Sequence, residues 1–303
     1  MKKILLGQQG LNVPAVGLGC MGMSEFYGKH NTPDNLKVLS RAVELGCTFW
    51  DSADMYGPFT NEELLGKAMA GQREKITLAT KFGIKRNKNG DWLGVDGHPD
   101  YVKASCDASL KRLKTDYIDV LYQHRIDPNI PIEDTVGAVA DLVKEGKVRY
   151  IGLSEADPEK IRRAHKVHPI SVLQTEYSLW SRDVETNILP TIRELGIGFV
   201  AYSPMGRGFL SGSIKHREDL QSDDWRLDNP RFQQNALDKN KALVQEINVI
   251  AENKNCTAAQ VSLAWLLAQG EDIAIIPGTK QVRYLEKNWQ SMQCKLSKDE
   301  MKI

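Results

Sequence analysis

Four titratable side chains stand at or just after the ends of predicted strands, and together they could carry acid–base chemistry. They are Asp51, Tyr56, Lys81 and His124. In a barrel of parallel strands such positions converge at the carboxyl face, where barrel enzymes hold their catalytic groups. Taken singly, each has an ordinary explanation, such as an aspartate that caps a turn or a tyrosine that packs on the surface. Their placement at three consecutive strand ends favours one shared site.

A cluster of these four groups is suited to protonating an oxygen atom. A phenol has a pKa of about 10, and a nearby ammonium lowers that pKa because it favours the phenolate. Lys81 is the candidate ammonium, Asp51 would hold it charged and in place, and His124 could hydrogen-bond the phenol and a substrate carbonyl. Such a site suits reduction of a carbonyl group, in which a cofactor must supply the hydride because no side chain can.

Eight short apolar stretches are typical of strands buried on both faces, as in a parallel sheet covered by helices. They are Val16–Gly19, Thr48–Trp50, Ile76–Thr80, Ile118–Tyr122, Tyr150–Leu153, Val172–Thr175, Gly198–Tyr202 and Ile273–Ile276. Helical periodicity lies between them, and prolines or capping residues mark helix starts. The predicted helices run from Thr32-Pro33 to Gly46, from Pro99, from Pro131 to Gly146, from Asp157-Pro158, and near 62–70, 185–195, 257–269 and 281–290.

Eight alternations of strand and helix predict an α/β fold, namely a closed (β/α)8 TIM barrel that forms one domain over residues 1–303. The pattern alone leaves an open doubly wound sheet as an alternative. Residues 3–13 predict a short N-terminal β-hairpin that turns at Gln-Gln-Gly. The stretch 205–237 is expected to be irregular, and a loop of that length in a compact domain usually has a function.

Composition excludes several classes of partner. Lys and Arg number 40 and Asp and Glu 39, a balance that argues against a nucleic-acid or membrane-surface footprint. The five cysteines are scattered, as expected of reduced thiols that are mostly buried. No apolar run approaches the length of a membrane span or of a signal-peptide core. We therefore expect a soluble, cytoplasmic protein with no nucleic-acid or membrane partner and no metal site.

Several motifs, in order along essentially the whole chain, resemble those of the aldo-keto reductase family. They are Asp51-x4-Tyr56, Lys81, Gln123-His124-Arg-x-Asp127-Pro128, Gly152-Leu-Ser154-Glu155, Gln174-x-Glu176-Tyr177-Ser178, Ala201-Tyr-Ser-Pro204-x-Gly-Arg207-Gly-Phe-Leu210 and Ile276-Pro-Gly-Thr279-Lys280. The Gly-Arg-Gly-Phe-Leu loop is most similar to the perakine-reductase-like branch of the NADP-dependent members. The resemblance implies NADPH-dependent reduction of aldehydes and ketones to alcohols.

The resemblance also implies a role for each residue near the reacting groups. Tyr56 would donate the proton, Lys81 and Asp51 would tune its pKa, and His124 would orient the substrate. Ser154 and Gln174 would hydrogen-bond the nicotinamide carboxamide, and Tyr202 would stack on the ring. Each of these last three has a structural alternative: a helix cap, a satisfied core amide and a residue that fills the barrel.

A Gly-rich stretch after the seventh predicted strand is the candidate site for the coenzyme diphosphate. It comprises Ser203, Pro204, Met205, Gly206, Arg207 and Gly208. Its position excludes a Rossmann motif, which follows a first strand, but barrels commonly bind phosphates at this point of the chain. Family likeness implies that the diphosphate lies under this loop, near Arg207. The alternative is a surface loop without a function.

The segment after the last strand is the candidate site for the 2′-phosphate of NADP(H). Backbone donors at Gly278 and Thr279, together with Lys280 and Arg283, would suit that group. Asn288 is a further implied coenzyme-binding residue. The sequence departs from the family pattern here, because Tyr284 stands where many relatives have an arginine and Lys287 replaces a common glutamate. NADP(H) is expected over NAD(H), and Lys280 and Arg283 are the expected phosphate-binding side chains.

Loops after the strands are expected to contact a small-molecule carbonyl substrate, because the barrel itself is generic. The candidates are Met23, Phe26, Tyr27, Trp92 and Trp180, each of which could instead be ordinary packing. The chain ends at Ile303, and longer relatives carry a C-terminal segment that shapes specificity. We therefore expect a comparatively open substrate pocket.

Two other classes of function remain alternatives. The β-subunits of voltage-gated potassium channels resemble this family and use bound cofactor as a sensor, so a non-catalytic regulatory subunit is one. The lack of an extended N-terminal segment favours the stand-alone enzyme over that subunit. An unrelated phosphate-handling barrel, such as an isomerase, is the other, but it would leave Tyr56 and Lys81 without a shared purpose. The sequence does not predict the oligomeric state.

Overall fold

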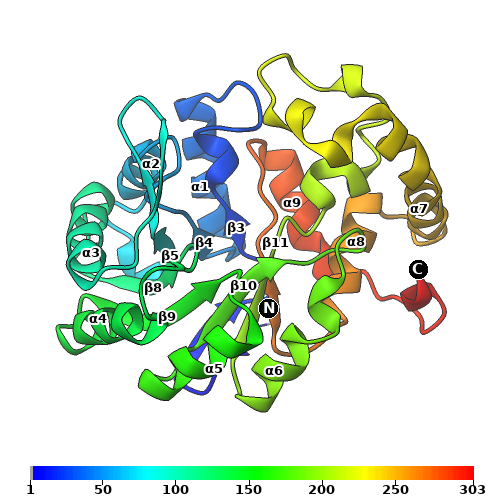
Figure 1. Ribbon diagram of the computed structural model, residues 1–303. Helices are drawn as coiled ribbons and strands as arrows, with labels where there is room; N and C mark the ends of the chain where they lie inside the picture. The colour runs from blue at the N-terminus through cyan, green and yellow to red at the C-terminus, as the bar shows by residue number, and fades with distance from the viewer. Residues whose placement is uncertain (1–2) are drawn as a thin grey trace.

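The computed structural model describes residues 3–303, and eight parallel strands form its central barrel (Figure 1). The strands are β3 (Leu18–Gly19), β4 (Phe49–Asp51), β5 (Thr77–Phe82), β8 (Ile118–Gln123), β9 (Val148–Ser154), β10 (Val172–Glu176), β11 (Gly198–Tyr202) and β12 (Ile273–Ile275). They pair in the order β12-β11-β10-β9-β8-β5-β4-β3. Val16 bridges Ile275, and Gly19 bridges Gly278, both in parallel, so the last strand returns to the first. The predicted (β/α)8 TIM barrel is confirmed.

Helices surround the barrel (Figure 1), and four of them begin at or next to a start that the sequence marks with a proline or a capping residue. They are α1 (Thr32–Leu45), α2 (Thr60–Ala68), α3 (Pro99–Leu113), α4 (Ile132–Lys144), α5 (Pro158–Val167), α6 (Ile188–Glu194), α7 (Gln234–Asn253), α8 (Ala258–Leu267) and α9 (Val282–Gln290). Asp157 caps α5 by accepting from the Lys160 N–H at 2.8 Å. Gly46 ends α1 in the left-handed region at φ 84°, which costs a glycine nothing.

The strands are buried on both faces, which explains their continuous apolar character. Trp50 and Phe199 are completely buried, and every residue of β8 is buried. The helices cover the outer face, and side chains from the strands fill the interior. Polar side chains inside this barrel therefore need partners from neighbouring strands.

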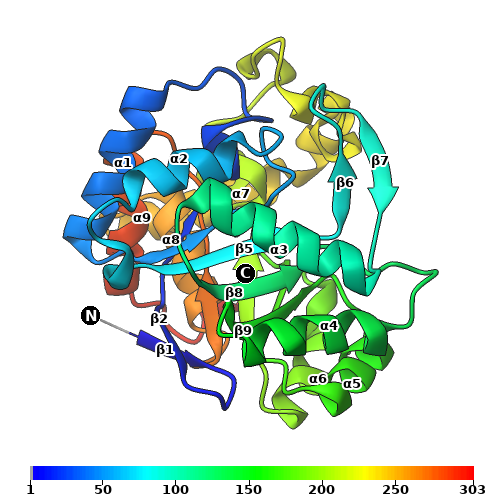
Figure 2. The same ribbon diagram turned by 90° about the vertical axis from the view of Figure 1, so that its left-hand side faces the viewer.

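The N-terminal hairpin is confirmed, and it lies at the end of the barrel where the strands begin. It consists of β1 (Lys3–Leu6) and β2 (Leu11–Pro14), paired antiparallel. Leu6 packs so tightly on Gly198, the first residue of β11, that a Cβ there would lie 2.6 Å from the Leu6 Cα. Figure 2 shows this hairpin at the opposite end of the molecule from the hairpin β6–β7.

Two elements were not predicted from the sequence. The first is the hairpin of β6 (Ile84–Arg86) and β7 (Trp92–Val95), which follows β5 at the carboxyl face. The second is α7, whose first four residues fall inside the stretch 205–237 that was expected to be irregular. The rest of that stretch contains short 3-10 turns, including 206–211 and 225–228. α7 was missed because it has no proline at its start and no side-chain cap, and its buried residues are only Leu237, Ile247 and Ala251.

All five cysteines are free thiols in the structure, three of them buried and two half-buried. Among residues 3–303, none of the helices combines the length and the apolar character that crossing a membrane requires.

Candidate functional site

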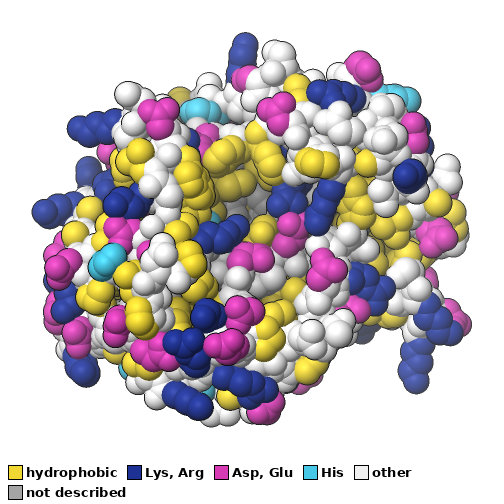
Figure 3. Space-filling view, in the orientation of Figure 1, with side chains coloured by type: hydrophobic (Ala, Val, Ile, Leu, Met, Phe, Trp, Pro, Cys, Tyr) yellow, Lys and Arg dark blue, Asp and Glu magenta, His cyan; other side chains and the backbone are white. Residues whose placement is uncertain are grey.

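A cavity of about 690 Å³ opens at the carboxyl ends of the strands. Figure 3 shows the hollow near the middle of one face, with hydrophobic side chains on its walls and charged side chains at its edge. Among the predicted residues near the reacting groups, the cavity is lined by Asp51, Tyr56, His124, Ser154, Gln174 and Tyr202. Among those predicted on the loops, it is lined by Phe26, Tyr27, Trp92, Ser203, Pro204, Met205, Arg207, Gly208, Gly278, Thr279 and Lys280. Residues far apart in the sequence thus share one space.

Met23 and Trp180 do not line the cavity, so their predicted substrate contacts are not supported. Met23 belongs to the hydrophobic core at 1% exposure, and its carbonyl accepts from Asn35 Nδ2 at 2.7 Å. The Trp180 ring stacks on Phe209, with 4.3 Å between the ring centroids. Both side chains pack against other parts of the chain. This is the alternative of ordinary packing that the sequence left open.

Three residues predicted to bind the coenzyme also lie outside the cavity lining. Gly206 adopts φ 53°, and a Cβ there would lie 2.8 Å from the Trp180 ring, so this glycine serves loop packing. Asn288 is buried within α9. The Arg283 guanidinium donates to Gln281 Oε1 at 2.8 Å and to the Tyr284 hydroxyl at 3.2 Å on the exposed side of α9. Its neighbour Tyr284 does line the cavity.

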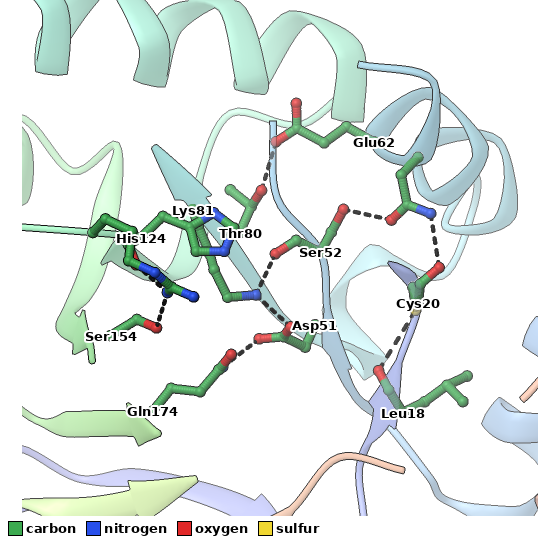
Figure 4. A network of polar contacts seen from close by, with 12 residues as sticks. Leu18, Cys20, Asp51, Ser52, Glu62, Thr80, Lys81, His124, Ser154 and Gln174 are labelled. Carbon is green, nitrogen blue, oxygen red and sulfur yellow. Dashed lines mark hydrogen bonds and ion pairs between the residues drawn. The ribbon is translucent and has the colours of Figure 1, made fainter. Parts of the chain in front are cut away.

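A buried ion pair forms the centre of the site (Figure 4). Lys81 Nζ donates to Asp51 Oδ1 at 2.5 Å and to the Ser52 carbonyl at 2.7 Å. Gln174 Nε2 donates to the other carboxylate oxygen of Asp51 at 2.7 Å. Lys81 itself is 1% exposed and does not line the cavity. Because Asp51 is bonded by two strands, β5 and β10, it is held rigidly beneath the cavity.

Tyr56 lies beside this pair, with Lys81 Nζ 5.3 Å from its ring centroid. Its ring meets His124 edge to face at 5.8 Å between centroids. Burial, followed by the negative charge of Asp51, raises the pKa of Tyr56 well above its ordinary value. The expectation that Lys81 lowers this pKa is thus not met, because burial has the largest effect and the negative charge of Asp51 adds to it. Tyr56 is therefore a fully protonated phenol at neutral pH.

His124 is a neutral imidazole. Burial, with the positive charges of Lys81 and Arg125, lowers its pKa well below the ordinary histidine value. A neutral imidazole carries one N–H donor and one acceptor nitrogen. The backbone N–H of His124 donates to the Phe82 carbonyl at 2.8 Å, which fixes the strand end that carries the ring. His124 and Tyr56 can thus both donate a hydrogen bond to one oxygen atom in the cavity.

The Gly-rich loop after β11 is held by ion pairs rather than left free. Arg207, at φ 56°, pairs with Glu176 at 2.6 Å. Its carbonyl accepts from Arg226 Nη1 at 2.7 Å, and Arg226 in turn pairs with Asp224 at 2.5 Å. The segment that follows the loop therefore lies across it, and Trp225 and Arg226 complete the cavity wall. The sequence predicted a function for the stretch 205–237, but it did not predict that Trp225 and Arg226 line the cavity.

Lys280 is turned toward the loop after β3. Its Nζ donates to the carbonyl oxygens of Tyr27 at 2.6 Å and of Lys29 at 2.8 Å. The Gly28 carbonyl completes the set at 3.4 Å. Burial lowers the pKa of Lys280. The predicted phosphate-binding cation therefore also anchors residues 27–29 to the segment after β12.

Arg125 lines the cavity and was missed among the predicted contacts. It directly follows His124, so its position beside one of the four predicted titratable residues was a signal that could have found it. Apolar wall residues Met21, Met55 and Ile84 were missed as well. They come from loops and from the unpredicted hairpin, for which periodicity gives no contact information.

One group of potential metal-ligand side chains lies apart from the cavity lining. Ligand atoms of Asp96, His98 and Asp127 lie within 4.8 Å of one another. The carboxylates already have partners, because Asp96 accepts from Lys85 and Asp127 accepts from the Gly97 and Asn129 N–H groups. The group accordingly fixes the turn that precedes α3.

Comparison with known proteins agrees with this geometry. The Aldo/keto reductase family profile matches residues 15–303. A thermostable aldo-keto reductase, Tm1743, solved with the inhibitor epalrestat, shares 31% identity at a TM-score of 0.80, covering 100% of this chain and 98% of that one. The glycerol dehydrogenase of Gluconobacter oxydans shares 25% identity at a TM-score of 0.90, with coverage of 99% and 93%. An aldo/keto reductase of Klebsiella pneumoniae, solved with NADP and acetate, shares 26% identity at 0.79, with the same coverage.

Proposed function

Because this chain belongs to the aldo/keto reductase family, we propose that it reduces aldehydes and ketones to alcohols with NADPH. The observation that carries the proposal is the buried Lys81–Asp51 pair beneath Tyr56, at the base of a cavity. Members of this family are NAD(P)-dependent oxidoreductases, and one structural neighbour was solved with NADP. A cytoplasmic location and a single domain over 1–303 belong to the same proposal. So does the perakine-reductase-like branch, on the strength of the Gly-Arg-Gly-Phe-Leu loop.

The residues around the cavity fit a dinucleotide coenzyme. Its volume of about 690 Å³ lies within the range of about 300–1,000 Å³ typical of ligand pockets. Ser154 and Gln174 offer polar groups for a carboxamide, and Tyr202 offers a flat ring. Arg207 and Lys280 are cations that suit phosphate groups on the same cavity wall. NADPH would supply the hydride when bound.

Tyr56 is the proposed proton donor. A raised pKa keeps its phenol protonated until negative charge develops on the substrate oxygen, at which point proton transfer becomes favourable. Neutral His124 donates its hydrogen bond to the same oxygen and so fixes its position. The Lys81–Asp51 pair positions Tyr56 from below, and Gln174 keeps Asp51 from turning away.

NADPH is proposed over NADH on the basis of Lys280, a cation on the cavity wall after β12. Charge-assisted hydrogen bonds to a 2′-phosphate are stronger than neutral ones. Arg283 lies near the start of α9, the helix that follows. A rotation of its exposed side chain would bring a second positive charge to the phosphate.

The test is consumption of NADPH in the presence of a panel of aromatic and aliphatic aldehydes, followed at the nicotinamide absorbance. Wild-type protein should oxidise NADPH with at least one class of aldehyde and form the corresponding alcohol. NADH should be a poorer donor. If NADPH binds tightly but no aldehyde of the panel is reduced, the reductase proposal fails and a cofactor-binding role takes its place.

A further inference from the structure

Arg125 is the cation closest in sequence to the proposed reacting groups, and its side chain lines the cavity. Its guanidinium donates to the His124 carbonyl at 2.7 Å and reaches Ser154 Oγ at 3.4 Å. The second contact is at the long limit of a hydrogen bond. A guanidinium has five N–H donors, so most of the donors of Arg125 have no partner within residues 3–303.

The other cations that line the cavity, and Lys81 beneath it, each have a partner within the protein. Lys81 pairs with Asp51, Arg207 with Glu176, and Arg226 with Asp224. Lys280 is held by three backbone carbonyls. Within the described part of the chain, Arg125 alone among these cations has neither a carboxylate nor such a set of carbonyls. Its charge thus faces the cavity without compensation.

The surroundings of Arg125 would strengthen an interaction with an anion. Apolar side chains, among them Met21, Met55 and Ile84, form much of the cavity wall. Apolar walls exclude water and lower the local dielectric, so a charge pair formed there is stronger than one in solvent. Arg125 lies within electrostatic reach of the proposed reacting groups. Its charge opposes the rise in the pKa of Tyr56 that burial and Asp51 cause, and it adds to the effect of burial and Lys81, which lower the pKa of His124.

We propose that Arg125 is a carboxylate subsite, and that the preferred substrates are carbonyl compounds that carry a carboxylate group. This inference rests on the proposed reductase function. The planar guanidinium would bind the carboxylate through two parallel N–H donors, while the substrate carbonyl oxygen lies between Tyr56 and His124. Arg125 would then determine specificity and orientation, without taking part in proton or hydride transfer.

The proposal also explains why this cation carries no internal carboxylate. A fixed aspartate or glutamate beside Arg125 would compete with an anionic substrate for the guanidinium and would repel it from the cavity. Glu155, the nearest acidic residue in sequence to Ser154, instead accepts from the Glu176 N–H at 3.0 Å. Glu176 itself is occupied by Arg207 and Arg231.

The test compares anionic substrates with neutral partners of nearly the same size. Phenylglyoxylate, 3-carboxybenzaldehyde and 4-carboxybenzaldehyde place the carboxylate at three distances from the carbonyl, and their carboxamides are the neutral partners. The measured quantity is the ratio of kcat/KM for acid over amide, in wild type, Arg125→Gln and Arg125→Lys. Because each ratio is taken within one protein, a general loss of activity in a variant cancels.

We expect wild type to prefer at least one acid over its amide by about tenfold or more, as a charge-assisted hydrogen-bonded pair provides. Arg125→Gln should abolish that preference, and Arg125→Lys should keep part of it. High salt should reduce the preference in wild type. Equal acid-to-amide ratios in wild type and Arg125→Gln at all three spacings would overturn the proposal.

Two further measurements separate the remaining outcomes. If Arg125 instead serves the coenzyme, Arg125→Gln will weaken NADPH binding in a fluorescence titration while leaving the ratios unchanged, which contradicts the subsite. Turnover of the neutral amides by wild type tests the reductase function independently. If nothing is turned over, benzoate binding followed by tryptophan fluorescence still tests the subsite, because wild type should bind benzoate more tightly than Arg125→Gln.

Discussion

At the scale of single residues, the site depends on a buried charged pair whose members are also hydrogen-bonded to neighbouring groups. Lys81 and Asp51 are almost fully excluded from solvent, and their partners Ser52 and Gln174 come from two different strand ends. Removing one member of a buried pair leaves the other charge uncompensated, which costs far more than the pair itself contributes. The position and the protonation state of Lys81 and Asp51 therefore affect the stability of the folded protein.

Replacing Lys81 with methionine tests this coupling. We expect Lys81→Met to lose activity and to lower the free energy of unfolding by about 3–5 kcal/mol, because Asp51 becomes an unpaired buried carboxylate. Urea denaturation measures the loss. Lys85→Met is the matched control, because its pair with Asp96 is partly exposed and exposed pairs contribute about 0–1 kcal/mol. Equal stability of the two variants would show that the buried pair is not a structural requirement.

The positions of the four titratable residues at or after strand ends could be predicted, because the sequence pattern shows where strands end. The protonation behaviour of Tyr56 could not. Sequence spacing predicts that Lys81 and Tyr56 approach each other, and the structure gives 5.3 Å from the ammonium to the ring centroid. It also predicts the pair of Asp51 and Lys81, but it does not predict that burial and the charge of Asp51 raise the pKa of Tyr56 well above its ordinary value. Side-chain distances of a few ångströms decide such pKa shifts, and no pattern encodes them.

At the scale of elements, residues that mark helix starts and ends were predictive, whereas the hairpin β6–β7 and α7, which lack such markers, were missed. Pro33 and Gly46 delimit α1, and Asp157 with Pro158 starts α5, each by its own backbone geometry. The hairpin β6–β7 has little buried apolar pattern, since Trp92 and Leu93 are exposed. Its position comes from tertiary contacts, including the pair between Arg86 and Glu25 at 2.6 Å.

Lys280 links the segment after β12 to the loop of residues 27–29, so its removal should affect both segments. We expect Lys280→Met to free the backbone carbonyls of residues 27–29, so that amide hydrogen exchange in this loop accelerates. NADPH binding should weaken by about tenfold or more if the same ammonium also meets the 2′-phosphate. NADH binding should change less.

Arg283→Met is the matched control for that experiment. It removes an exposed cation near the start of α9 without affecting the contacts of residues 27–29. Unchanged exchange in both variants would contradict the anchoring role of Lys280. Equal weakening of NADPH and NADH would show that Lys280 shapes the loop without recognising the phosphate.

At the scale of the whole molecule, topology was the most predictable feature. Eight two-sided apolar strands separated by amphipathic helices leave few arrangements, because parallel strands need crossovers and a closed barrel removes both edges. The loops that build the cavity were the least predictable. Residues such as Arg125 and Trp225 are brought together only by the closed barrel and by the segment that follows β11.

Asp54 makes global stability depend on pH. It is 3% exposed, one carboxylate oxygen has no hydrogen-bond partner within residues 3–303, and burial followed by the charge of Glu62 raises its pKa well above the ordinary value. A group whose folded pKa exceeds its unfolded pKa contributes stability that is complete below the unfolded value, about 3.9, and is lost as pH rises toward the folded pKa. Asp54 therefore makes the folded protein less stable as pH increases.

Asp54→Asn should remove this pH dependence while keeping the shape of the side chain. We expect the variant to gain stability relative to wild type as pH rises from about 4 to about 7, measured by urea denaturation across that range. Asp116→Asn is the control, since Asp116 is exposed on the surface and its replacement should leave the profile unchanged. A wild-type-minus-variant difference that is constant with pH would contradict the assignment to Asp54.

The central claim is that Tyr56 gives the proton during carbonyl reduction, and a single-turnover experiment on Tyr56→Phe tests it most directly. The variant keeps the ring that packs against His124 and loses only the hydroxyl. Protein preloaded with NADPH is mixed with an aldehyde that wild type reduces, and the decay of the nicotinamide absorbance is followed. We predict NADPH binding close to wild type and a decay about 10²–10⁴-fold slower, the usual contribution of a general acid. A decay at the wild-type rate would contradict the claim.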